Sequence, residues 1–472
     1  MIEQLLNRQV ILDALKDIKK YLDPNHDTGR RGDEALPPEA NDLSDTDYTQ
    51  AYSDVQTALD NELRESTGQI GFDSTDGRRG QQAVLDDVSF FSRDPIVSIV
   101  QSALEQYYEE QAVDQLEETD GGDGRRGGDA AVLTGKRIKG LDESVGPDGR
   151  RLLKPFEITD PGWVSCLVAM GIRKLKDRHP FNPEIATPVE IPDKNRMIFF
   201  GDWASGIPRA QLIADQIRKY IDGNDGPVEH VVHLGDTYYS GWPNEFEKRF
   251  LDCWPVATNE ADKIGSWSVN GNHDMYSGGE GFFKTLLSDP RFGWHEKSSL
   301  FKLENKHWRI LGLDTAYKDH DLESPQDEWI AEEAHKAKEK GQKLMLLSHH
   351  QLFSTYESDG EALKAKLAPL LEQELIHTWF WGHEHRCVVY KPHQGVRYAR
   401  CIGHAGVPVY VTTKTPEPGK APYAYHYTED KIVRGLEKYA VFGFCVLDCD
   451  GPEISVRYLN EFGNEHYREI IS

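Results

Sequence analysis

The chain has 472 residues, which is too long for one ordinary domain, so two domains are expected. It carries 54 Lys and Arg against 79 Asp and Glu, a formal net charge of -25, which argues against a surface devoted to binding the nucleic-acid backbone. Hydrophobic residues at 38% and aromatic residues at 10% provide a sizeable core, which excludes global disorder.

The sequence also indicates in which cellular compartment the protein is expected. No stretch approaches the ~20 consecutive apolar residues of a membrane-spanning helix. The first 20 residues mix acidic, basic and apolar side chains, unlike the apolar centre of a signal peptide. The six cysteines are scattered without a CxxC pattern, which is typical of reduced thiols. The sequence therefore predicts a cytoplasmic protein without a membrane partner.

The first third of the chain has helical periodicity. Apolar residues recur at helical spacing up to Leu22, and similar patterns run over 47–63, 96–116 and 163–175. Most of the excess negative charge falls within the first 150 residues. We therefore expect an acidic, mostly helical N-terminal region over residues 1–185, followed by a second domain over 190–472.

A Gly-Arg-Arg motif recurs in the N-terminal region at irregular spacing, within residues 26–33, 74–81, 121–128 and 146–153. Asp-Gly and flanking glycines favour turns, so solvated linker loops are one interpretation. The other is a set of exposed dibasic sites that an Arg-specific protease cuts or that dock an acidic partner.

From about Arg196 onward, short apolar runs end in charged or glycine-rich loops, and helical patterns intervene over 210–220 and 326–340. This alternation is typical of an α/β protein whose site lies at the carboxyl ends of its strands. The last segment, roughly 396–467, is expected to be rich in strands, with a closing hairpin around Asp450 and Gly451.

Five of these apolar runs end in side chains that bind metals. The ends read Gly-Asp (201–202), Gly-Asp-Thr-Tyr-Tyr (235–239), Gly-Asn-His-Asp (271–274), His-His (349–350) and Gly-His-Glu-His (382–385). Carboxylates, an amide and imidazoles suit Fe, Mn or Zn. Each piece alone is weak evidence, because a Gly-Asp turn is common and a single buried histidine is usually structural. All five together predict a metal site.

The order GD, GDxxY, GNHD, HH, GHEH resembles the calcineurin-like metallophosphoesterase superfamily over roughly residues 195–410. The resemblance implies a four-layer α-β-β-α sandwich, here preceded by the helical region, with 190–472 as the catalytic domain. It also implies hydrolysis of phosphate esters by a dinuclear metal centre, in which metal-activated hydroxide attacks phosphorus.

One departure concerns the first motif, in which most of the superfamily has Asp-x-His. Here Ala204 stands two residues after Asp202. Tyr239, three residues after Asp236, restores the number of ligands if the chain is similar to the GDxxY subgroup of purple acid phosphatases. Those enzymes use a tyrosinate that favours Fe(III), paired with a divalent Fe, Mn or Zn ion. Tyr238 would then point to the opposite side of an extended segment.

The resemblance assigns a role to each matching position. Metal one would be held by Asp202, Asp236, Tyr239 and His385, and metal two by Asp236, Asn272, His349 and His383. Gln351 stands where the fourth motif usually has Pro, so His350 remains an alternative to His349. His273 would stabilise the transition state and act as general acid, with Asp274 orienting its ring.

Substrate and activity class stay open. The substrate could be a phosphorylated small molecule, a nucleotide or a phosphoprotein. Candidate contacts are Trp203, His350 and Tyr276, although packing in the core or at its rim is the favoured interpretation for most of the aromatic residues. The alternatives to a phosphatase are a phosphodiesterase or nuclease acting on nucleotides with the same metals, and a non-catalytic scaffold on the same fold.

Overall fold

The computed structural model describes residues 8–23, 42–68, 91–119, 143–145, 151–153, 161–223, 226–408, 416–428, 431–434 and 437–472. The chain divides into two compact units, Met1–Lys176 and Asp177–Ser472. Within the described residues, no helix has both the length and the apolar character that crossing a membrane requires.

The first unit contains helices at the positions that periodicity predicted: α1 (Arg8–Leu22), α2 (Asp45–Gly68), α4 (Pro95–Thr119) and α5 (Pro161–Lys176). Asp94 caps α4, since its Oδ1 accepts hydrogen bonds from the backbone N–H groups of Ile96 and Val97 at 2.8 and 3.0 Å. Pro95 follows as the first helical residue, where its missing N–H costs nothing. The apolar side of α1 is buried, with Leu15 and Ile18 fully enclosed.

Two short strands, β1 (Glu143–Val145) and β2 (Arg151–Leu153), pair antiparallel in the same unit. Arg151, predicted to lie in a loop, is therefore the first residue of a strand. The other Gly-Arg-Arg dibasic pairs, at 30–31, 78–79 and 125–126, and residue 150 lie outside the described residues.

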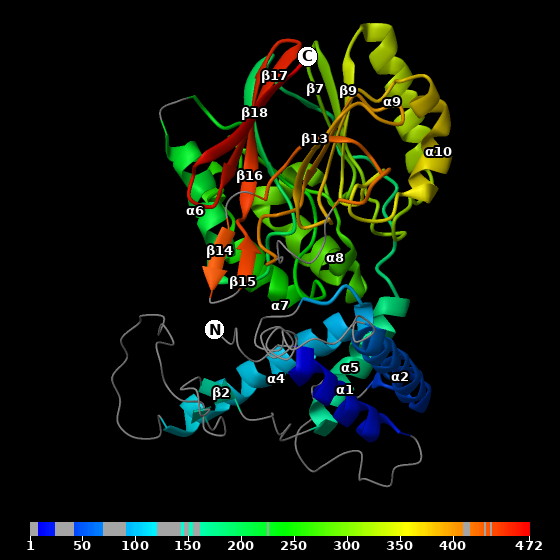
Figure 1. The fold of residues 1–472 in the computed structure, drawn as a ribbon, viewed down its shortest axis with the longest axis vertical. Helices are drawn as coiled ribbons and strands as arrows, with labels where there is room; N and C mark the ends of the chain where they lie inside the picture. Colours follow the sequence, from blue (N-terminus) through cyan, green and yellow to red (C-terminus); the bar gives the residue numbers. More distant parts are fainter. Residues whose placement is uncertain are drawn as a thin grey trace. The chain divides into compact units, whose positions relative to one another are not determined.

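The second unit is built on two β-sheets (Figure 1). The eight-stranded sheet has the order β13 (Tyr423–His426), β11 (Cys387–Tyr390), β12 (Tyr398–Ile402), β10 (Thr378–Trp381), β9 (Lys343–Ser348), β8 (Trp308–Gly312), β7 (Phe301–Glu304), β3 (Val189–Glu190). The six-stranded sheet has the order β18 (Glu465–Ile471), β17 (Glu453–Asn460), β16 (Gly443–Asp450), β4 (Lys194–Phe200), β5 (His230–His233), β6 (Gly265–Ser268). A separate hairpin joins β14 (Lys431–Arg434) to β15 (Glu437–Ala440).

Helices cover the outer face of each sheet. Helix α6 (Pro208–Asp222) flanks the six-stranded sheet, and α9 (Gln326–Lys340) and α10 (Glu361–Glu372) flank the other (Figure 1). The side chains that α6 buries follow helical spacing from Ala210 to Ile217. The main core lies between the sheets and includes Phe199, Met345 and Val456. The predicted four-layer α-β-β-α sandwich is confirmed, and so is the hairpin at Asp450 and Gly451 that joins β16 to β17.

Strand direction determines where the site can form. Strands β4, β5 and β6 run parallel in one sheet, and β8, β9, β10 and β12 run parallel in the other. The carboxyl ends of parallel strands meet at one edge of a sheet. The connections that follow β5 and β6 carry short helices, namely α7 (Pro243–Glu245), η3 (Phe246–Phe250), η4 (Leu251–Cys253), η5 (Thr258–Glu260), α8 (Asn272–Tyr276), η6 (Gly281–Thr285), η7 (Leu286–Ser288) and η8 (Pro290–His295).

Candidate metal centre

Side chains from five strand ends converge in one buried cluster. Asp202 follows β4, Asp236 follows β5, Asn272 begins α8 after β6, His349 follows β9, and both His383 and His385 follow β10. All are less than 9% exposed. Two glycines permit the close approach: a Cβ on Gly235, whose φ is +95°, would lie 2.5 Å from His349 Nδ1, and one on Gly271 would lie 2.3 Å from Asp236 Oδ1.

The first half of the cluster holds Asp202, Asp236 and His385, whose ligand atoms lie within 4.8 Å of one another. The hydroxyl oxygen of Tyr238 lies 3.2 Å from Asp202 Oδ1, 3.2 Å from Asp236 Oδ2 and 2.9 Å from His385 Nε2. One hydroxyl proton can serve only one of these acceptors at a time. A cation among these four side chains would satisfy all of them together.

The second half converges on the amide oxygen of Asn272. His349 Nε2 lies 2.9 Å and His383 Nδ1 3.0 Å from Asn272 Oδ1, and the two nitrogens are 3.2 Å apart. His349 Nδ1 donates to the backbone carbonyl of Leu234 at 2.8 Å, which leaves Nε2 as the nitrogen that faces the cluster. Such a fixed tautomer is typical of histidines that bind metals.

Asp236 joins the two halves. Its Oδ2 lies 3.3 Å from His349 Nε2, in addition to its place beside Tyr238. Burial alone would raise the pKa of Asp236, but the imidazoles of His349 and His273 outweigh burial and hold that pKa well below its ordinary value. Burial opposes charge on His349 as well, yet the Asp236 carboxylate raises the pKa of this imidazole to about 9. A cation bound here would displace the proton from Nε2.

The structure differs from the sequence prediction at the tyrosine. Tyr239 was assigned to the cluster from its GDxxY position, and Tyr238 was turned away on the expectation of an extended segment. Residues 238–240 form a turn instead, so that expectation for Tyr238 does not apply. Tyr239 instead places its ring 4.8 Å from the Arg249 guanidinium, a cation–π contact, and its backbone N–H donates to Glu245. Tyr238, which the alternation turned away, brings its hydroxyl to the cluster.

The predicted relation between His273 and Asp274 also differs. His273 Nδ1 donates to the backbone carbonyl of Tyr239 at 2.6 Å, so this carbonyl, not Asp274, orients the ring. Asp274 accepts backbone hydrogen bonds from Asp236, Thr237 and Gly271 at 3.2, 2.8 and 2.7 Å. Because these three N–H groups converge on its carboxylate, Asp274 orients the loop that carries Asp236.

Of the predicted substrate contacts, Trp203 is placed in the core. It is 1% exposed, its Nε1 donates to the Ala210 carbonyl at 2.7 Å, and its ring packs against Phe250 and Trp254. The indole therefore packs in the core. Tyr276 accepts a 2.5 Å hydrogen bond from the Asn272 amide nitrogen, which leaves the amide oxygen facing the cluster.

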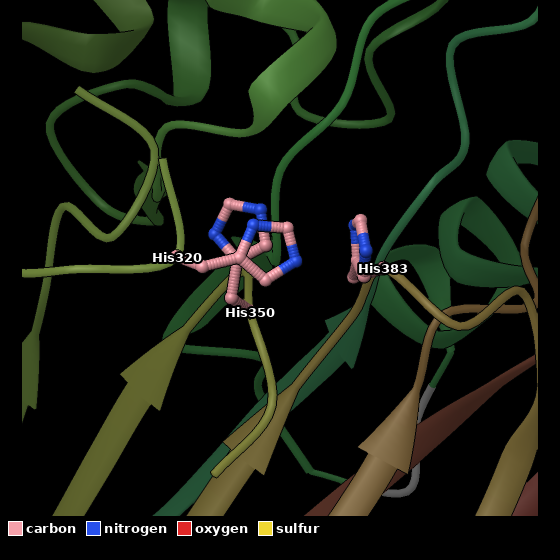
Figure 2. Close-up of side chains that lie close together, drawn as sticks. All are labelled: His320, His350 and His383. Carbon is pink, nitrogen blue, oxygen red and sulfur yellow. The ribbon is translucent and has the colours of Figure 1, made fainter. Parts of the chain in front are cut away.

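His350 lies beside the centre, in a group of three imidazoles with His320 and His383 (Figure 2). Its ring centroid is 3.8 Å from that of His320 and 4.7 Å from that of His383. His350 Nδ1 is 3.1 Å from the Thr315 hydroxyl. His349, rather than His350, faces Asn272. His320 was not predicted, because it comes from a loop without a recognisable motif.

The chain resembles known proteins over part of its length. Residues 196–387, less than half of the chain, match the model of the calcineurin-like phosphoesterase family. A search of the curated proteins gives no match.

Among solved structures, a purple acid phosphatase from yellow lupin (Lupinus luteus) is 17% identical, with 60% of this chain and 55% of that chain covered and a TM-score of 0.43. The match thus spans little more than half of the lupin protein. The GAP50 anchor of the Plasmodium inner membrane complex is 14% identical, with coverages of 59% and 89% and a TM-score of 0.44. A dimetal phosphatase from Danio rerio is 14% identical, with coverages of 59% and 98% and a TM-score of 0.40.

The six clustered ligand-type residues and Tyr238 all lie inside the matched segment. The match to the calcineurin-like phosphoesterase family thus covers every residue of the candidate centre.

Proposed function

We propose that the Asp177–Ser472 unit hydrolyses phosphate esters with two bound metal ions. The observation that carries this proposal is the pair of overlapping ligand sets that share Asp236. A bridging carboxylate between two sets of oxygen and nitrogen ligands is the arrangement that two-metal hydrolysis needs. When bound, the two ions would supply a water of lowered pKa and neutralise charge on the phosphoryl oxygens.

The chain's own residues divide between the two ions. Asp202, Asp236, His385 and Tyr238 would hold the first, and Asp236 with Asn272, His349 and His383 would hold the second; in this assignment Tyr238 replaces Tyr239. The phenol of Tyr238 supports Fe(III) in the first position, with divalent Fe, Mn or Zn in the second, because a hard anionic oxygen favours the more highly charged ion.

His273 is proposed to stabilise charge on the substrate and to give a proton to the leaving oxygen. Its Nδ1–H is committed to the Tyr239 carbonyl, so Nε2 is the nitrogen that can hold and release the transferred proton. Its backbone N–H donates to Asp236 Oδ1 at 2.9 Å, which places the residue next to the shared carboxylate. His350, beside the centre, is kept as a proposed substrate contact.

The test is metal analysis and a substrate panel with the full-length chain. We expect about two metal equivalents at the centre and faster hydrolysis of phosphomonoesters than of phosphodiesters. Asp236→Asn should abolish turnover and lower the metal content. The matched control is Asp321→Asn, an isosteric change at a carboxylate that contacts Lys318 and Lys366 instead.

Each other outcome has a defined meaning. Preferential cleavage of diesters would favour the phosphodiesterase alternative. A metal-free, inactive protein that stays folded would favour a scaffold. Full activity in Asp236→Asn would remove the basis of the proposal.

A further inference from the structure

A second group of metal-binding side chains lies between the two sheets, and none of its members belongs to the proposed dinuclear centre. It comprises Cys387 at the start of β11, His404 in the loop after β12, and His466 on β18. Their ligand atoms lie within 4.8 Å of one another. Since β11 belongs to the eight-stranded sheet and β18 to the six-stranded sheet, the group connects the two layers.

His404 is the residue that needs an explanation. It is 3% exposed, and among the described residues neither of its ring nitrogens has a hydrogen-bond partner. Leaving a buried polar group unpaired destabilises the folded state. Burial, together with the nearby His466, lowers the pKa of His404 to about 3, so the ring is neutral at pH 7 and keeps a lone pair for a ligand.

The other two residues are held in orientations that suit a ligand. The Tyr425 hydroxyl lies 2.9 Å from His466 Nδ1, so Nε2 is the nitrogen that we assign to the ion. The Tyr427 ring stacks on His466 at a centroid distance of 3.7 Å and an interplanar angle of 2°. Cys387 is buried at 2% exposure, and its carbonyl accepts from the Tyr427 N–H at 3.0 Å.

We propose that Cys387, His404 and His466 form a Zn²⁺ site that links the two sheets. A thiolate and two neutral imidazoles suit Zn²⁺, and they fill three of its four tetrahedral positions. The fourth position falls to water or another small ligand. Burial raises the pKa of the Cys387 thiol, so the thiol stays protonated without an ion. Zn²⁺ binding would release that proton to solvent, which makes the affinity increase with pH.

Cobalt distinguishes this site from the dinuclear centre. The proposed dinuclear ligands contain no sulfur, whereas Co²⁺ bound to Cys387 would give a sulfur-to-cobalt charge-transfer band in the near ultraviolet. We expect the Co²⁺-loaded full-length protein to show the band and the Cys387→Ala variant to lack it. In metal analysis, Cys387→Ala should also bind one equivalent of Zn²⁺ less than the unmodified chain. The matched control is Cys449→Ala, which changes a buried cysteine of the same inter-sheet core and should keep both.

Two further measurements keep the proposal testable if Cys387→Ala fails to fold. The charge-transfer band can be sought in the unmodified chain, which needs no substitution. His404→Ala, which adds no charge, should shift the band and weaken Zn²⁺ binding at least tenfold. Absence of the band in the Co²⁺-loaded unmodified chain would overturn the proposal. So would an unchanged band and unchanged Zn²⁺ content in folded Cys387→Ala, whatever the activity of the dinuclear centre.

Discussion

The two adjacent tyrosines allow the metal centre to be tested by paired substitutions. Tyr238→Phe removes a hydroxyl that lies within 3.2 Å of Asp202, Asp236 and His385. Hydrogen bonds to charged groups contribute about 1.5–3 kcal/mol, and about 1.4 kcal/mol corresponds to a factor of ten. We therefore expect the affinity for the first metal to fall about 10- to 100-fold, and the rate to fall with it.

Tyr239→Phe is the matched control. It keeps the ring that lies over Arg249, and it keeps the backbone N–H and carbonyl that contact Glu245 and His273. Substitutions away from a critical contact change stability by about 0.5 kcal/mol or less, which corresponds to roughly a twofold effect. We expect metal affinity and rate close to those of the unmodified chain.

Visible absorption gives the most direct assay. A phenolate bound to Fe(III) absorbs visible light by charge transfer, so iron-loaded protein should be coloured, Tyr238→Phe should be bleached, and Tyr239→Phe should keep its colour. If the native ions are colourless, chelator competition measures the same difference in affinity. The opposite result, in which Tyr239→Phe is bleached and Tyr238→Phe keeps its colour, would refute Tyr238 as the ligand. It would instead support Tyr239, the ligand assigned from the GDxxY spacing.

Three further substitutions test the surroundings of the centre. Asp274→Asn places an amide NH₂ among three backbone N–H donors, so metal affinity in a chelator titration should fall about 10- to 100-fold. His273→Ala should lower kcat about 10²- to 10⁴-fold with unchanged metal content, and a matching loss of metal would contradict its proposed role. Trp203→Ala should destabilise the fold by about 3–5 kcal/mol in urea denaturation, since the indole fills the core. A stable but inactive Trp203→Ala would instead support a substrate contact.

The strand ends could be predicted from the sequence because each carries its own local signal. An apolar run, a glycine and a ligand-type side chain occur together at Asp202, Asp236 and His383, and the parallel sheet then brings the ends to one edge. Helix α9 was predicted with its observed bounds, whereas α10, which is interrupted by Pro369 in the sequence, was not predicted. Local pattern therefore accounts for the scaffold and most of the centre.

The structure differs from the sequence predictions where side-chain direction depends on the fold. Trp203 follows Asp202 directly, but the chain turns there, and the indole enters the core while the carboxylate enters the cluster. Tyr238 and Tyr239 are exchanged for a similar reason, since alternation holds only in extended backbone. The ring of His320 contacts that of His350, and His320 lies in a loop that no sequence motif marks. The sequence motifs therefore locate the centre along the chain, whereas packing of the folded chain decides which side-chain atoms face it.

Hydrogen bonds within the chain hold the backbone of the centre in its conformation. Asp202, Asp236, His383 and His385 have left-handed φ values of 55°, 76°, 66° and 52°. This conformation costs roughly 1–2 kcal/mol for each residue other than glycine. Hydrogen bonds within the chain hold it, since the His383 N–H donates to Asp202 Oδ2 at 2.8 Å and the Asp202 N–H donates to the Gly235 carbonyl at 2.9 Å. Because these bonds lie within the chain, they would keep the ligand side chains oriented and so lower the ordering cost of binding an ion.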